Sequence, residues 1–136
     1  LGFLAGTETT TLAEVVDAAE AVRRTGPRTV LVTSVLHDDC PDDALDMVVV
    51  GDGGAWVTRT PRLAINPPGA GDLTSAVFLA NVLAGHPLPE ALARTTASVF
   101  AVMEATAAAG SREMRIVEAQ EGLANPQRRF EATQLR

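Results

Sequence analysis

The stretch NPPGAGDLTS at residues 66–75 is the strongest break in the chain, and the neighbouring segments are interpreted around it. Two glycines flank a small residue directly before an apolar segment with helical spacing. Backbone N–H groups of such a loop can point at one spot, because no bulky side chain blocks the approach, and a helix N-terminus adds partial positive charge. The stretch therefore predicts an anion hole formed by Gly69, Ala70 and Gly71.

Asp72 follows at the rim of this predicted anion hole. A carboxylate there can accept the proton of an attacking hydroxyl while the loop stabilises charge on a phosphoryl group in transfer. The alternative is structural: Asp72 is an ordinary helix N-cap, and the glycines only shape a turn. Local sequence leaves both open. The long apolar helix predicted after Asp72 favours the catalytic interpretation, because it makes the loop part of a core element.

The segments before the loop alternate between helical and strand patterns. A capping box, TLAE at residues 11–14, opens a helix that continues to about residue 22 and ends before Gly26 and Pro27. Strands are predicted at 29–33, 47–50 and 55–59, with Asp52-Gly53 as the hairpin turn between the last two. This order predicts a three-layer α/β fold, with a mostly parallel sheet that contains one hairpin and with helices on both faces.

Helical patterns dominate the second half of the chain. Residues 73–83 and 89–109 are predicted as two helices, a third covers 113–121, and Pro126 opens a short fourth. Neither an internal repeat nor a linker divides the chain, so residues 1–136 are predicted to form a single domain or part of one. Because the chain begins with Leu1 rather than Met, we expect this to be the C-terminal portion of a longer polypeptide.

Composition excludes several classes of protein. The formal net charge is -6, all 11 cations are Arg, and no basic stripe follows any segment, which argues against nucleic-acid and anionic-membrane binding. The absence of Lys excludes a Walker-type phosphate loop. The single Cys40 favours a reducing, cytoplasmic compartment. No apolar run approaches the roughly 20 residues that span a bilayer.

Residues 66–75 resemble the second signature of the ribokinase superfamily, in which glycine–small–glycine–aspartate opens a long helix. Within that superfamily the chain is similar to the pyridoxal kinases over essentially its whole length. The supporting stretches are VLVTS at 30–34, Ala55-Trp56, VEAQ at 117–120 and ANP at 124–126. The resemblance implies a ribokinase-like fold and transfer of a phosphoryl group from MgATP to the 5′-hydroxymethyl group of pyridoxal, pyridoxine or pyridoxamine.

The resemblance also implies roles for individual residues. Asp72 matches the family's catalytic base, which contacts the vitamer hydroxyl, and Gly69, Ala70 and Gly71 match its anion hole. The positions that match its ATP contacts are Thr33 and Ser34 after the first strand, the segment Arg59, Thr60, Pro61, Arg62 and Leu63, and Met103 on the adenine wall. ATP and Mg²⁺ are the implied cofactors, and a homodimer is the implied assembly. The family's vitamin pocket, lid and magnesium-linked motif do not occur in this chain, so no metal ligand is assigned and these 136 residues alone are expected to be inactive.

Two further alternatives stay open from the sequence. A sister kinase of the superfamily would act on hydroxymethylpyrimidine or a sugar, whereas a silent nucleotide-binding module would keep the loop for its shape alone. Residues 37–40, His-Asp-Asp-Cys, contain metal-ligand types, but adjacent residues converge poorly on one ion. They are predicted to form a solvated acidic loop.

Overall fold

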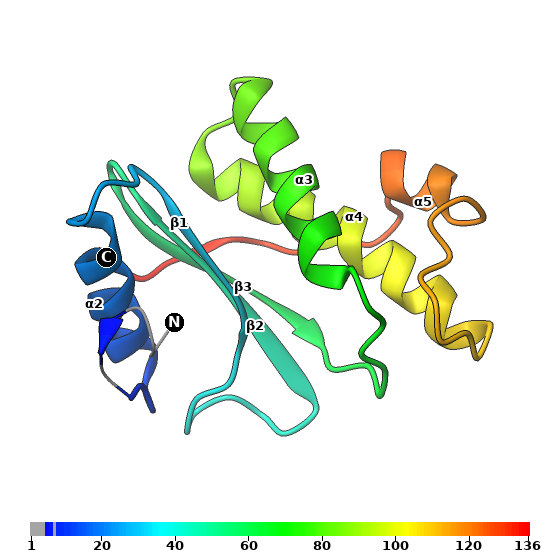
Figure 1. Cartoon of the computed structure of the whole chain (residues 1–136), viewed down its shortest axis with the longest axis horizontal. Helices are drawn as coiled ribbons and strands as arrows, with labels where there is room; N and C mark the ends of the chain where they lie inside the picture. The colour runs from blue at the N-terminus through cyan, green and yellow to red at the C-terminus, as the bar shows by residue number, and fades with distance from the viewer. Residues whose placement is uncertain (1–4, 7) are drawn as a thin grey trace.

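The computed structural model describes residues 5–6 and 8–136, arranged in three layers (Figure 1). A four-stranded sheet forms the middle layer, α2 covers one face, and α3 with α4 covers the other (Figure 1). The elements are α2 (Leu12–Arg23), β1 (Val30–Val35), β2 (Ala44–Gly51), β3 (Gly54–Pro61), α3 (Ala70–Leu83), α4 (Leu88–Ala108), α5 (Gln120–Ala124) and β4 (Thr133–Gln134). The predicted α/β class and the helices on both faces are confirmed.

The sheet itself differs from the prediction. Its strand order is β1-β2-β3-β4, and all three neighbouring pairs are antiparallel. The expectation of a mostly parallel sheet is therefore wrong for the part of the chain that the structure describes. For the first two pairs the physical reason is connection length. Residues 36–43 join β1 to β2 and a two-residue turn joins β2 to β3, whereas a parallel pair needs a crossover of a dozen or more residues.

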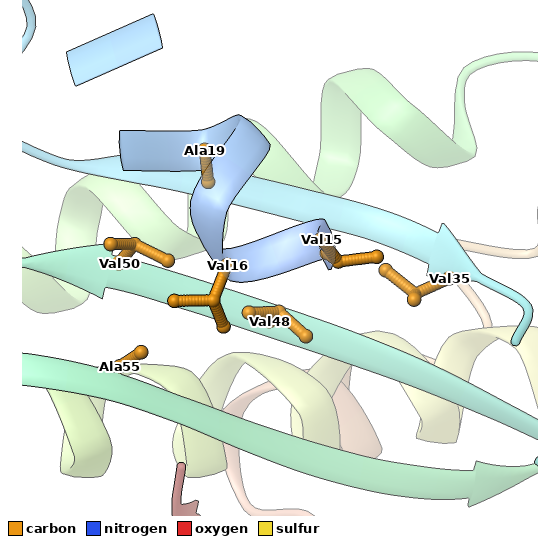
Figure 2. Packing of buried hydrophobic residues seen from close by; sticks show 7 residues of the cluster. All are labelled: Val15, Val16, Ala19, Val35, Val48, Val50 and Ala55. Atoms are coloured by element: carbon orange, nitrogen blue, oxygen red, sulfur yellow. The ribbon is translucent and has the colours of Figure 1, made fainter. Parts of the chain in front are cut away.

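The capping box forms as predicted at the start of α2. The Glu14 N–H donates to the Thr11 hydroxyl at 3.3 Å, and the Glu14 carboxylate accepts from the Thr11 N–H at 3.0 Å. The buried face of α2 then packs on β1, β2 and β3 through Val15, Val16, Ala19, Val35, Val48, Val50 and Ala55 (Figure 2). A second cluster, of Val49, Phe78, Ala91 and Leu92, fills the space between the sheet and the α3–α4 layer.

The C-terminal segment is less helical than predicted. Residues 113–115 are irregular, residues 116–119 form a turn, α5 is only five residues long, and Pro126 opens no helix. Side-chain hydrogen bonds hold these turns in place of a helix ladder: the Glu113 N–H donates to the Ser111 hydroxyl at 3.2 Å, and the Arg115 N–H to the Thr106 hydroxyl at 3.0 Å. The remaining residues run back to the sheet, where β4 pairs with β3 (Figure 1).

The C-terminal residues explain why position 54 in the β2–β3 hairpin is a glycine. Gly54 has a φ of 143°, and a Cβ atom there would collide with the Arg136 carbonyl oxygen, which accepts a hydrogen bond from the Ala55 N–H at 3.0 Å. The glycine thus lets the C-terminal residues close against the start of β3. Among the described residues, no helix has both the length and the apolar character needed to cross a membrane.

Candidate active site

A cavity of about 200 Å³ lies between one end of the sheet and the α3–α4 layer. It brings together segments that are far apart in the sequence, from the end of β1 to the middle of α4. Eight of the residues predicted from the sequence line it, namely Thr33, Ser34, Thr60, Pro61, Leu63, Ala70, Gly71 and Met103. A compartment with apolar walls and a helix N-terminus at one side is suited to a ligand that combines a flat apolar part with an anion.

The remaining wall of the cavity was not predicted. It consists of Leu45, Asp46 and Met47 on β2, Ile65 and Asn66 before the loop, Thr74 on α3, and Thr96, Val99 and Phe100 on α4. Thr96 is buried, and its hydroxyl lies 2.7 Å from that of Thr58 on β3. The available signal was the adjacent pair of threonines at 95–96 in an Ala-rich helix. Each hydroxyl also bonds to a carbonyl four residues earlier, as ordinary helical Thr does.

The loop geometry distinguishes the roles of the two glycines. Helix α3 begins at Ala70, and its N-cap is Gly69, whose φ is +86°. Gly71 is already helical, and a Cβ atom added there would meet nothing within 4 Å. Gly69 therefore shapes the turn, while Gly71 leaves the mouth of the cavity open.

Backbone donors are available at the start of α3. The Ala70 N–H donates to the Pro67 carbonyl across a long 3.4 Å. Among the described residues, the N–H groups of Gly71 and Asp72 have no hydrogen-bond acceptor. Unpaired N–H groups beside a cavity are what an anion hole requires.

Asp72 lies in the first turn of α3 and is exposed. No side-chain hydrogen bond caps this helix, so Asp72 does not act as the N-cap that the structural alternative assumed. The carboxylate is thus free to meet a substrate at the same helix end as the open N–H groups. Together with Gly69, Arg59 and Arg62, Asp72 belongs to the predicted site residues that lie outside the cavity wall.

A bulge shapes the β1 side of the cavity. The register passes from Val32 opposite Val48 to Val35 opposite Asp46, so β1 carries one extra residue there. Ser34 within the bulge has a φ of 55°, which is uncommon for a residue other than glycine. Backbone held in this region costs about 1–3 kcal/mol and is concentrated at functional sites. The bulge exposes both Thr33 and Ser34 at the cavity.

Behind the bulge lies a charged cluster, which we call the Asp46 cluster and define as His37, Asp46 and Arg59. His37 and Asp46 are buried, whereas the Arg59 side chain is 45% exposed. The Asp46 side chain is fully buried and receives two bonds from the Arg59 guanidinium, Nε to Oδ1 at 2.7 Å and Nη2 to Oδ2 at 2.8 Å. The His37 Nε2 atom lies 2.9 Å from Asp46 Oδ2. The structure thus places the Arg59 guanidinium in an ion pair rather than on the cavity wall.

The His-Asp-Asp-Cys loop also differs from the sequence interpretation. His37 is buried, not solvated, and ligand atoms of His37, Cys40 and Asp46 lie within 4.8 Å of one another. However, Arg59 occupies both Asp46 oxygens, which neutralises the carboxylate without a cation. Burial raises the pKa of the Cys40 thiol, which keeps it in the protonated form that binds metals poorly.

The Asp46 cluster predicts a specific dependence of stability on pH. Burial by itself would raise the pKa of Asp46, but hydrogen bonds from Arg59 and His37 outweigh it, so the pKa lies below its ordinary value. A lowered carboxyl pKa stabilises the folded state above the unfolded-state pKa, and this contribution is lost as the pH falls through the folded-state pKa. We expect the free energy of unfolding of wild type to fall more steeply below about pH 4 than that of Asp46→Asn. Urea unfolding between about pH 2 and pH 6 measures this, and parallel curves would contradict it.

Comparison with known proteins places this geometry in a family. Residues 1–116 match the family model described as phosphomethylpyrimidine kinase. The pyridoxal kinase PdxY of Leifsonia xyli subsp. xyli is 42% identical over 130 residues, which are 96% of this chain and 46% of that protein. The pyridoxal kinase PdxY of Rubrobacter xylanophilus is 45% identical over 131 residues, covering 96% of this chain and 45% of the relative.

A solved structure agrees with the fold. The pyridoxal kinase of Leishmania donovani, in complex with ADP and pyridoxine, superposes with a TM-score of 0.84 at 23% identity, covering 99% of this chain and 48% of that one. The chain therefore spans about half the length of the relatives it matches, and it shares the ribokinase-like fold of the solved structure. The extent of the family match shows that this chain belongs to the phosphomethylpyrimidine kinase family.

Proposed function

We propose that the full-length protein carrying this chain transfers a phosphoryl group from ATP to the 5′-hydroxymethyl group of pyridoxal, pyridoxine or pyridoxamine, with pyridoxal 5′-phosphate as the product from pyridoxal. The observation that carries the proposal is the cavity that joins Thr33, Thr60 and Met103 to the open N-terminus of α3. Relatives named pyridoxal kinase, about 40% identical across nearly the whole chain, support this substrate class. The Leishmania donovani enzyme was solved with ADP and pyridoxine, which fits a cavity of this composition.

In the proposed reaction, Asp72 accepts the proton of the vitamer hydroxyl as its oxygen attacks the γ-phosphorus of ATP. A bond forms between that oxygen and phosphorus, the bond to the β–γ bridging oxygen breaks, and ADP leaves with the electron pair. The backbone N–H groups of Gly71 and Asp72 donate to the phosphoryl oxygens as charge accumulates on them. Thr33, Ser34, Thr60, Pro61 and Leu63 bind the nucleotide, and Met103 packs against the adenine.

Mg²⁺ is the cofactor proposed with ATP, and it would neutralise charge on the phosphates. The described residues fit it only weakly as protein ligands, because Asp46 is committed to Arg59 and only the exposed Asp72 lies at the phosphate end. We therefore propose that the ion binds mainly through the nucleotide. We also propose a cytoplasmic location and a homodimer. The lone Cys40 supports the former, and the exposed Leu79 and Leu83 on one side of α3 support an apolar interface there.

A substrate comparison tests the proposed function. The full-length protein is incubated with MgATP and, separately, pyridoxal, pyridoxine, pyridoxamine or hydroxymethylpyrimidine, and ADP release is measured. We expect at least one B6 vitamer to give a kcat/KM about tenfold or more above that of hydroxymethylpyrimidine, a difference of roughly 1.4 kcal/mol in transition-state binding. Turnover of hydroxymethylpyrimidine alone would favour the second candidate, which the family description supports. Nucleotide binding without turnover of any acceptor would favour the silent module.

A further inference from the structure

The Asp46 cluster has no part in the proposed chemistry, although burying two of its members, His37 and Asp46, is costly. The side chain of Asp46 is 0% exposed and that of His37 is 1% exposed. The Nδ1 atom of His37 is buried without a hydrogen-bond partner among the described residues. Removing charged and polar groups from water costs several kcal/mol per ion, and well-packed apolar residues in place of a buried ion pair are often as stable. The neighbours of Asp46 on the same face of β2 are Val48 and Val50, so an apolar side chain could pack at position 46 as well.

The position of the Asp46 cluster at one end of the sheet indicates a structural role. Asp46 is the cross-strand partner of Val35 on β1 and of Arg59 on β3, so its carboxylate ties together three consecutive strands at one end of the sheet. Side chains alternate between faces along a strand. Asp46 therefore shares the α2 face with Val48, whereas Met47 lies on the opposite face. Both residues belong to the cavity wall, and His37 and Arg59 lie behind it.

Each member of the cluster adjoins a part of the proposed nucleotide site. Arg59 immediately precedes Thr60 and Pro61, which line the cavity. His37 follows the bulge that presents Thr33 and Ser34, and its carbonyl accepts the Cys40 N–H at 2.9 Å, which closes a turn within the β1–β2 loop. The strained φ of Ser34 persists only when its surroundings fix it, and the bond between His37 and Asp46 anchors the chain three residues later.

We infer that the Asp46 cluster is a positioning device that holds the Thr33–Ser34 bulge and the Thr60–Pro61 strand end in register for the nucleotide. The inference rests on the proposed function in that it takes the cavity to bind a nucleotide. His37 and Arg59 lie outside the cavity wall, and the carboxylate of Asp46 is buried and bonded to Arg59, so all three act as positioning residues. Without the bonds from Asp46 to Arg59 and His37, the cavity wall becomes less rigid and nucleotide affinity falls. The chemical step at Asp72, which lies on a different element, is largely retained.

The test measures nucleotide affinity apart from catalysis in the full-length protein. Calorimetry gives the Kd of MgADP, steady-state kinetics with the best acceptor gives KM for ATP and kcat, and thermal unfolding gives Tm. The variants are Asp46→Asn and Arg59→Lys. The second keeps the positive charge but loses the bidentate hydrogen bond to Asp46. Asp52→Asn is the matched control, because it breaks an exposed carboxylate–Arg pair at the other end of the same hairpin.

For Asp46→Asn we expect the Kd of MgADP and the KM for ATP to rise about tenfold, with kcat within about threefold of wild type. Arg59→Lys is expected to raise both constants by about threefold, and Asp52→Asn to leave them unchanged. A wild-type Kd for MgADP in folded Arg59→Lys would overturn the inference, even where Asp46→Asn fails to fold. Equal losses in kcat and kcat/KM would also overturn it, because they place the cluster in the chemical step.

Two further outcomes are separable. If wild type itself binds no MgADP, the proposed function fails at the first measurement, before any variant is compared, and this inference fails with it. If micromolar Zn²⁺ raises the Tm of wild type but not of Asp46→Asn, the cluster is a metal site of His37, Cys40 and Asp46, and the positioning role is overturned.

Discussion

Replacing Asp72 by Asn should lower kcat by roughly 10²–10⁴-fold in the full-length protein, the usual range for loss of a general base. The amide has nearly the same shape but cannot accept the proton of the attacking hydroxyl. Asp72 is exposed and makes no side-chain cap to α3, so the fold should not depend on its charge. We therefore expect an unchanged Tm and a Kd for MgADP close to that of wild type, with the whole effect in turnover.

The control for Asp72→Asn is Asp39→Asn, which removes an exposed carboxylate from the β1–β2 loop. Both variants change net charge equally, so a difference between them reports the position of the charge. Stopped-flow mixing with MgATP and pyridoxal measures the chemical step apart from product release. A kcat for Asp72→Asn within threefold of the control would remove Asp72 from the mechanism.

Substituting Val for Gly71 should abolish most turnover, by about 100-fold or more, with little loss of stability. A Cβ atom at Gly71 meets open space in the free protein, and the residue already has a helical conformation, so the folded state accepts a side chain. The branched side chain instead occupies the cavity mouth where the phosphoryl oxygens should lie. Thermal unfolding together with steady-state kinetics and the Kd of MgADP checks both parts.

Gly69→Ala is the informative counterpart, because the two glycines differ in backbone conformation. At Gly69 the φ of +86° disfavours any side chain, and a Cβ atom would lie 3.1 Å from Met114 Cε. We expect Gly69→Ala to destabilise the protein by about 1 kcal/mol, whereas Gly71→Val leaves Tm nearly unchanged. If Gly71→Val instead lowers Tm severely while the remaining folded enzyme keeps full activity, the glycines of the loop are structural only.

The sequence alone determined the features that depend on neighbouring residues. The capping box at Thr11 and Glu14, the hairpin turn at Asp52-Gly53 and the helix after the glycine loop all form where local chemistry predicts them. These depend on hydrogen bonds within one turn or on the φ preference of one residue, so no distant partner is needed. The motif at 69–72 likewise allowed an anion hole and a base to be predicted, because its residues are adjacent in the chain. These two roles stay predictions.

Tertiary structure decided what depends on partners that are far apart in sequence. Strand pairing made the sheet antiparallel, and the same pairing placed Arg59 opposite Asp46, so that the guanidinium went to a buried carboxylate instead of the cavity. His37, which the sequence predicted in a solvated loop, is buried as part of that cluster. Periodicity cannot reveal such contacts, because a charged residue in a strand looks the same whether its partner is water or a side chain on the next strand.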